Sequence, residues 1–157
     1  MKCYKIEPLY YFCFQLISKM ANYTILNTVS NKHSTEKTLV AIIDGEHSDT
    51  LEKFYSFIAA QLKFPDNFGN NFDAFDEMIN DLDWLEEDRI YLIFRNYDIF
   101  LVEENDEARE ILLTILDDAA SEWKRMDGEG KTLKILIEPS ELGEDDLETL
   151  GIEFTTA

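Results

Sequence analysis

Carboxylate side chains gather at helical spacing within residues 64–88. This segment holds nine Asp and Glu residues and no Lys or Arg. Four of its polar side chains share the spacing that places residues on one face of a helix: Asp73, Asp76, Glu77 and Asn80. Carboxylates on a rigid face accept charge-assisted hydrogen bonds from Arg, Lys and His. The pattern predicts a surface that binds a cationic partner, although solvated helix faces of this kind are also common.

The same segment carries an apolar face that would anchor such a helix in a core. Its members recur at i, i+3, i+7 and i+10: Phe72, Phe75, Ile79 and Leu82. A loop rich in Pro, Asn and Gly precedes them, so we expect the helix to begin at Asn71. Asp73 and Glu77 form an i,i+4 like-charge pair, which weakens an isolated helix. This small penalty is a further indication that the charges serve a partner.

Catalytic and metal-binding chemistry finds little support in the sequence. His33 and His47 are the only histidines, and neither stands in a recognisable arrangement with Ser, Cys or Asp. Paired carboxylates hydrolyse glycosides only across a cleft, which adjacent turns of one exposed helix do not form. Oxygen ligands at residues 66–73 resemble a calcium loop, but Phe68 occupies the third position of an EF-hand register starting at Asp66. We expect no enzymatic activity, no metal site and no cofactor.

The composition is that of one folded, strongly acidic domain. The chain has 157 residues, of which 45% are hydrophobic, and a formal charge of −19. A field of this sign repels nucleic acid and anionic membranes and favours cationic partners, although solubility alone can account for it. We therefore expect neither a nucleic-acid partner nor a membrane partner.

The N-terminal segment holds both cysteines, Cys3 and Cys13, which form no metal-ligand pattern and no disulfide framework. A reducing cytoplasm is therefore the expected location. The apolar run at residues 9–17 resembles a signal-peptide core, but Gln15 interrupts it and no small-residue cleavage site follows. The run is also too short to span a bilayer. Met20 is an alternative start of the protein.

Hydrophobic patterning predicts the elements that position the acidic helix. Short apolar runs at residues 38–43, 89–94 and 133–137 are typical of buried strands, and Asp44-Gly45 closes the first. Helices separate these runs, so the strands should form a parallel sheet. Residues 22–37 are polar and should form a linker or frayed edge. Two further helices are expected, one from a cap at Ser48 or Asp49 to about residue 62 and one at about 106–126 capped by Asn105. An acidic capped helix at 140–150 and a possible extra edge strand at 151–155 complete the chain.

A motif in the acidic segment resembles that of a known family. Residues 64–75 read F-P-x-x-F-G-x-N-x-D-A-F, and Asp81-Leu82 and Trp84-Leu85 follow. This pattern is similar to that of the barstar family of ribonuclease inhibitors, and the similarity covers residues 37–138. It implies an α/β fold with a small three-stranded parallel sheet flanked by helices. Residues 1–36 would then be an N-terminal extension, and residues 139–157 an acidic C-terminal extension packed on or next to the domain.

The resemblance also implies a site. In the family a loop and the second helix plug a ribonuclease active site, where acidic residues take phosphate positions. The helix-start aspartate corresponds to Asp73 and the central acid four positions later to Glu77. Gly69 and Asn71 match loop positions that approach the enzyme, and Asp118 matches an acid on the long helix.

Two positions depart from the family prototype. Asn67 replaces a loop aromatic residue, and Asp76 replaces a helix tryptophan, so apolar contact area gives way to polar groups. The expected partner is a basic extracellular-type ribonuclease or a nuclease toxin, bound one to one. The alternative is an acidic interaction module that binds a cationic partner without inhibiting a nuclease. The predicted partner-binding residues are Asn67, Gly69, Asn71, Asp73, Asp76, Glu77 and Asp118.

Overall fold

A computed structural model describes residues 21–27, 37–125 and 131–157 of the chain. The predictions that concern Cys3, Cys13, residues 9–17, Met20 and His33 lie outside this part. The elements follow in the order β1 (Tyr23–Ile25), β2 (Thr38–Asp44), the 3₁₀ turn η2 (Gly45–His47), α2 (Leu51–Gln61), α3 (Phe72–Asp81), β3 (Arg89–Arg95), the 3₁₀ turn η3 (Tyr97–Ile99), α4 (Asp106–Arg125), β4 (Thr132–Ile137), α5 (Glu141–Leu150) and β5 (Phe154–Thr156).

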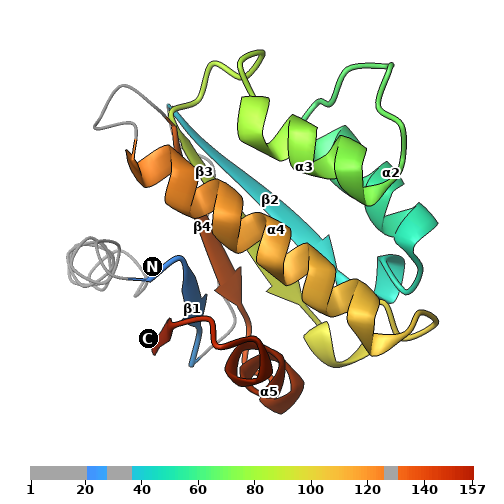
Figure 1. Cartoon of the computed structure of the whole chain (residues 1–157), viewed down its shortest axis with the longest axis vertical. Helices are drawn as coiled ribbons and strands as arrows, with labels where there is room; N and C mark the ends of the chain where they lie inside the picture. The colour runs from blue at the N-terminus through green and yellow to red at the C-terminus, as the bar shows by residue number, and fades with distance from the viewer. Residues whose placement is uncertain (1–20, 28–36, 126–130) are drawn as a thin grey trace, which may run out of the picture.

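The strands form one parallel sheet in the order β2-β3-β4-β1-β5 (Figure 1). Ile43 of β2 lies beside Phe94 of β3, which in turn lies beside Ile137 of β4. The prediction of a parallel α/β sheet built on strands near residues 38–43, 89–94 and 133–137 is therefore confirmed.

The predicted number of three strands is wrong, because β1 and β5 bring the sheet to five. Residues 22–37 were expected to be a linker or frayed edge, but Tyr23–Ile25 is a buried strand between β4 and β5. Three residues are too few to show strand periodicity, so tertiary contacts fix β1. The buried Tyr23 hydroxyl donates a hydrogen bond to the backbone oxygen of Leu113 at 2.5 Å. The edge strand expected at residues 151–155 is observed as β5, with the shorter range Phe154–Thr156.

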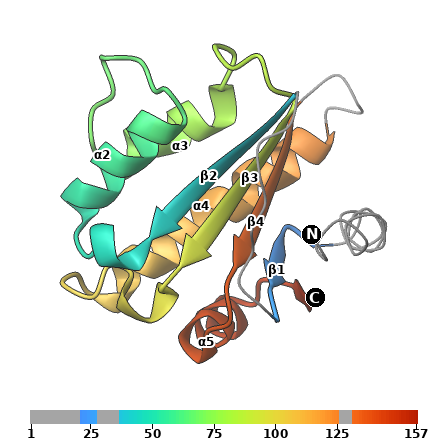
Figure 2. The same ribbon diagram turned by 180° about the vertical axis from the view of Figure 1, so that it is seen from behind.

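Three helices cover one face of the sheet. In Figure 1, α4 lies in front of the strands with α3 and α2 beside it next to β2, and the view from behind in Figure 2 shows β2, β3 and β4 on the near side of α4. Residues of α2, α3 and α4 share one core cluster with the sheet. Aromatic rings fill the interface between helices and sheet: Phe54 meets Phe75 edge-on at 5.4 Å and Phe100 at 5.6 Å between ring centroids. In the described part of the chain, no helix combines the length and apolar character that a membrane crossing requires.

Three of the four helices considered begin at the N-cap residue expected from the sequence. Asn71, Asn105 and Ser140 each accept a hydrogen bond from the backbone N–H three residues ahead, as expected for N-caps. The predicted cap of α2 at Ser48 or Asp49 is wrong, because the Thr50 hydroxyl accepts from the Lys53 N–H. Asp49 instead pairs with the Lys53 ammonium at 2.8 Å.

Gly45→Ala is expected to lower the free energy of unfolding by about 3 kcal/mol. A β-carbon at Gly45 would lie 2.1 Å from the backbone oxygen of Asn96 and 2.9 Å from the backbone nitrogen of Phe100. Backbone atoms cannot move aside cheaply, so the turn between β2 and α2 must shift. Gly69→Ala is the matched control, since its nearest neighbour would be the Asn71 side chain at 3.3 Å. Urea unfolding measures both variants, and equal midpoints would contradict the close approach at Gly45.

Candidate protein-binding surface

Asn71 joins the loop at residues 64–71 to helix α3. Its side-chain oxygen caps the helix by accepting from the Ala74 N–H at 2.8 Å, and its side-chain nitrogen donates to the Gly69 carbonyl at 3.1 Å. Both Asn71 and Gly69 are exposed. These two hydrogen bonds hold the loop in one conformation at the start of α3, so at least one role of Asn71 is structural.

The apolar face of α3 is buried as predicted. Phe75, Ile79 and Leu82 are fully buried, and Phe72 is half-buried against the core. The Trp123 indole of α4 donates a hydrogen bond to the Ile79 carbonyl at 3.2 Å. This packing fixes the orientation of α3, and therefore the direction in which its opposite face points.

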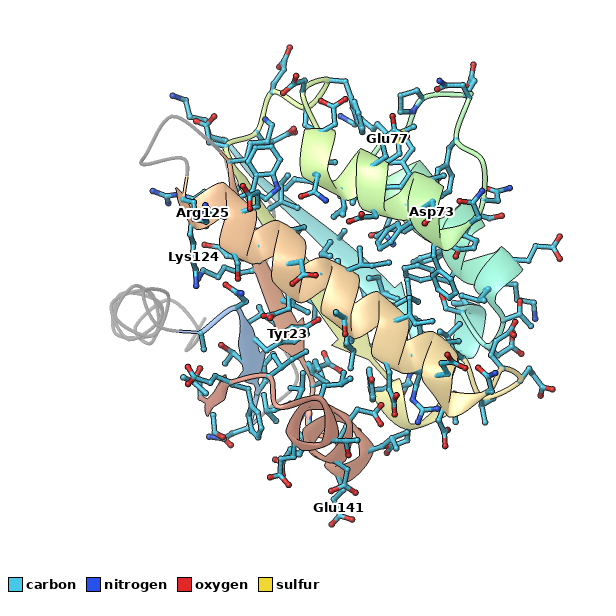
Figure 3. The ribbon with its side chains drawn as sticks, in the orientation of Figure 1. Tyr23, Asp73, Glu77, Lys124, Arg125 and Glu141 are labelled. Atoms are coloured by element: carbon cyan, nitrogen blue, oxygen red, sulfur yellow. The ribbon has the colours of Figure 1, made fainter. Side chains whose placement is uncertain are left out.

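The opposite face of α3 presents the predicted carboxylates to solvent. Asp73, Asp76 and Glu77 are all exposed, and Figure 3 shows Asp73 and Glu77 one turn apart on α3. The Asp76 carboxylate accepts from the Asn80 side chain at 2.9 Å. Asn67 is also exposed, in the preceding loop. The structure thus brings six of the seven predicted residues together over residues 67–77.

The seventh predicted residue, Asp118, belongs to α4, the helix that packs against α3. Burial raises the pKa of its carboxyl, and the neighbouring charges of Asp117 and Asp76 raise it further. Asp118 is exposed on the helix that contacts α3, so we group it with the α3 carboxylates. We call Asn67, Gly69, Asn71, Asp73, Asp76, Glu77 and Asp118 the acidic surface.

Asp117 was missed by the sequence analysis. Its carboxylate accepts a hydrogen bond from the Asn22 side chain at 2.9 Å, which ties the start of β1 to α4. The Asp117-Asp118 pair on the long helix was visible in the sequence, but its proximity to Asp76 depends on how α3 and α4 pack.

The acidic surface lacks compensating cations within the described part of the chain. The five ion pairs found there join Asp49, Glu138, Asp106, Asp146 and Glu122 to Lys or Arg, and none of them involves α3 or Asp118. No cluster of three or more possible metal ligands occurs among the same residues. A cavity of about 660 Å³ is lined by residues 25–27 at the end of β1, by Asp98 of η3 and by residues around the start of α5, and by none of the acidic surface.

Asp118→Asn is expected to raise the melting temperature at pH 7. Folded Asp118 binds its proton more tightly than unfolded Asp118 does, because its folded pKa is raised. Its charge therefore opposes folding above the ordinary Asp pKa of about 3.9, and this effect disappears below that value. In thermal unfolding experiments, the melting temperatures of the variant and the wild type should become equal near pH 3. A variant that is no more stable at pH 7 would contradict the raised pKa, and Glu148→Gln on α5 controls for net charge.

A parallel sheet with helices on one face, and an acidic helix with no ion pair among the described residues, defines a small α/β domain with an exposed acidic surface. The family model Barstar (barnase inhibitor) matches residues 38–138, and the chain belongs to this family. The family is one of ribonuclease inhibitors rather than enzymes. The matched residues include α2, α3 and α4, and exclude β1, α5 and β5.

Other comparisons support the fold alone. No curated protein matches the chain. Two structures of the Drosophila ORC bound to Cdc6 and to AT-rich or GC-rich DNA each match with a TM-score of 0.55, at 16% and 15% identity and over 99% and 97% of this chain. This chain spans about half of those chains, 53% and 54%. A structure of Drosophila ORC bound to DNA matches with a TM-score of 0.52 at 15% identity, over 99% of this chain and 91% of that one.

Proposed function

We propose that this protein inhibits a basic ribonuclease, or a related nuclease toxin, by covering its active site with the acidic surface. The observation that supports this most directly is the family match, which spans the loop at residues 64–71, the whole of α3 and Asp118. The formal charge of −19 is complementary to a cationic enzyme and would speed the encounter of the two proteins.

The carboxylates of α3 would take the places of substrate phosphates. A nuclease active site already directs Arg, Lys and His side chains at phosphate oxygens, and a carboxylate accepts the same charge-assisted hydrogen bonds. Asp73 and Glu77 lie on a helix whose other face is packed in the core, so little backbone freedom is lost on binding. Binding energy should concentrate on Asp73, Asp76 and Glu77, with the loop providing shape.

The target nuclease should present polar groups to Asn67 and Asp76, because these residues replace two aromatic side chains of the family prototype. Asn67 and Asp76 are exposed and stand at the two positions where the prototype has aromatic side chains. Asp76 and Asp118 together favour a partner that brings a cation to the margin between α3 and α4. If the partner nuclease is toxic to the cell that produces it, fast one-to-one inhibition would protect that cell.

Titration of basic ribonucleases with the purified protein tests the proposal. Barnase and a panel of other basic ribonucleases and deoxyribonucleases are each held at fixed concentration while nucleic-acid cleavage is followed. We expect cleavage by at least one enzyme to fall to zero with a break at equimolar protein. Binding of a basic nuclease with cleavage unchanged would support the interaction module instead. Cleavage unchanged across the panel, with no binding, would overturn both the target class and the mechanism.

A further inference from the structure

The two edges of the sheet differ in how their backbone groups are satisfied. At the β2 edge the Gln61 side chain of α2 accepts from the Ile42 N–H at 2.6 Å and donates to the Ile42 carbonyl. The side-chain amide thus takes the position that a neighbouring strand would occupy. Proteins protect exposed strand edges because such edges readily pair with other chains.

The opposite edge, β5, has no such protection within the described part of the chain. The Ala157 N–H donates to the Ile25 carbonyl at 3.0 Å, and the Ala157 carbonyl accepts from the Asn27 N–H at 2.6 Å. Both groups of Ala157 therefore point toward β1. Alternate residues of a parallel strand direct these groups to opposite sides. Phe154 and Thr156 therefore direct theirs outward, beyond the last strand of the sheet.

An apolar groove lies near the start of β5, between residues 152–155 and Ala21, which precedes β1. It has a volume of about 410 Å³ and is lined by Ala21, Ile152, Glu153, Phe154 and Thr155. Phe154 is only half-buried there. A strand added to β5 would place alternate side chains on the face of the sheet that carries Phe154, with the others on the opposite face.

We propose that the β5 edge and this groove bind an extended segment of a cationic protein as a sixth strand. The segment would alternate apolar and basic side chains. The formal charge of −19 favours a basic occupant and disfavours a second copy of this chain, which carries the same charge. This surface lies outside the family match at residues 38–138 and is formed by elements separate from α3.

Binding of a synthetic peptide tests the proposal on the full chain. The probe is a hexapeptide of alternating lysine and valine, and the control alternates lysine and glycine, with equal charge but low strand propensity. Calorimetry should detect the first peptide and not the second. Hydrogen exchange at the Thr156 N–H should slow when the lysine–valine peptide is added. Equal binding of the two peptides, or unchanged exchange at Thr156, would overturn the proposal.

Thr156→Pro separates edge pairing from general charge attraction. Proline removes the outward N–H and is tolerated in edge strands, so peptide affinity should fall about tenfold while the fold is retained. Glu77→Lys should leave peptide binding intact, which separates this result from failure of the proposed nuclease inhibition. Dimerisation of the wild type that Thr156→Pro abolishes would identify a second copy as the occupant and overturn the proposal.

Discussion

Glu77→Lys is expected to abolish ribonuclease inhibition while leaving the fold intact. Glu77 is exposed on the middle of α3, with no ion pair in the described part of the chain. Loss of one partner of a desolvated interfacial charge pair costs about 2–5 kcal/mol. A reversed charge facing a cationic active site should therefore weaken inhibition by at least about a hundredfold.

The folded state should tolerate this change well. Lysine is a good helix former, and the substitution replaces the repulsion between Asp73 and Glu77 by an i,i+4 attraction. Glu148→Lys makes the same change of charge at an exposed position of α5 and should inhibit as the wild type does. The inhibition constant and the unfolding midpoint are measured for both variants. Full inhibition by Glu77→Lys would show that α3 is not the inhibitory element.

Asp146→Ala should have the largest effect on stability, lowering the free energy of unfolding by about 4 kcal/mol. Asp146 of α5 is 7% exposed and accepts from the Arg109 guanidinium at 2.9 Å and from the Tyr97 hydroxyl at 2.8 Å. Removal of the carboxylate leaves the Arg109 charge buried, with only the exposed Asp106 as a partner at 3.0 Å. Burial, and then the charge of Asp146, raises the pKa of Tyr97, which stays neutral.

Asp145→Ala provides the matched control, because Asp145 is the exposed neighbour on the same helix. It should change the free energy of unfolding by less than about 0.5 kcal/mol. The comparison also tests whether α5, outside the family match, unfolds together with α4. If Asp146→Ala were as stable as Asp145→Ala, α5 would contribute little to the cooperative unit, and residues 139–157 would be a separable extension.

The predictable parts of the fold are those with a repeating pattern. Helix α3 was evident from its spacing because Phe75, Ile79 and Leu82 are spaced to meet one core and Asn71 is a strong cap. Strand β1 could not be predicted, because three residues show no periodicity and Tyr23 is held by contacts with α4, ninety positions along the chain. The α2 cap is Thr50, and the Asp49 side chain pairs with Lys53 instead, a choice among three adjacent polar residues that the sequence pattern did not decide.

The part of the candidate surface that lies on one helix was predictable from residue spacing. Asp73, Asp76 and Glu77 share a helix face, so spacing alone brings them together. Asp118 entered through the family resemblance, and its closeness to Asp76 depends on packing between α3 and α4 that spacing within one helix does not determine. Their roles in binding a partner remain predictions.

Competition with a mononucleotide tests the central claim most directly. Once an inhibited ribonuclease is found, its apparent dissociation constant for this protein is measured at rising concentrations of a nucleoside 3′-monophosphate, with chloride adjusted to hold ionic strength constant. If carboxylates of α3 occupy the phosphate positions, the apparent constant should rise linearly with nucleotide concentration and double where the nucleotide half-fills the free enzyme. An apparent constant independent of nucleotide concentration would place the protein away from the active site and contradict the mechanism.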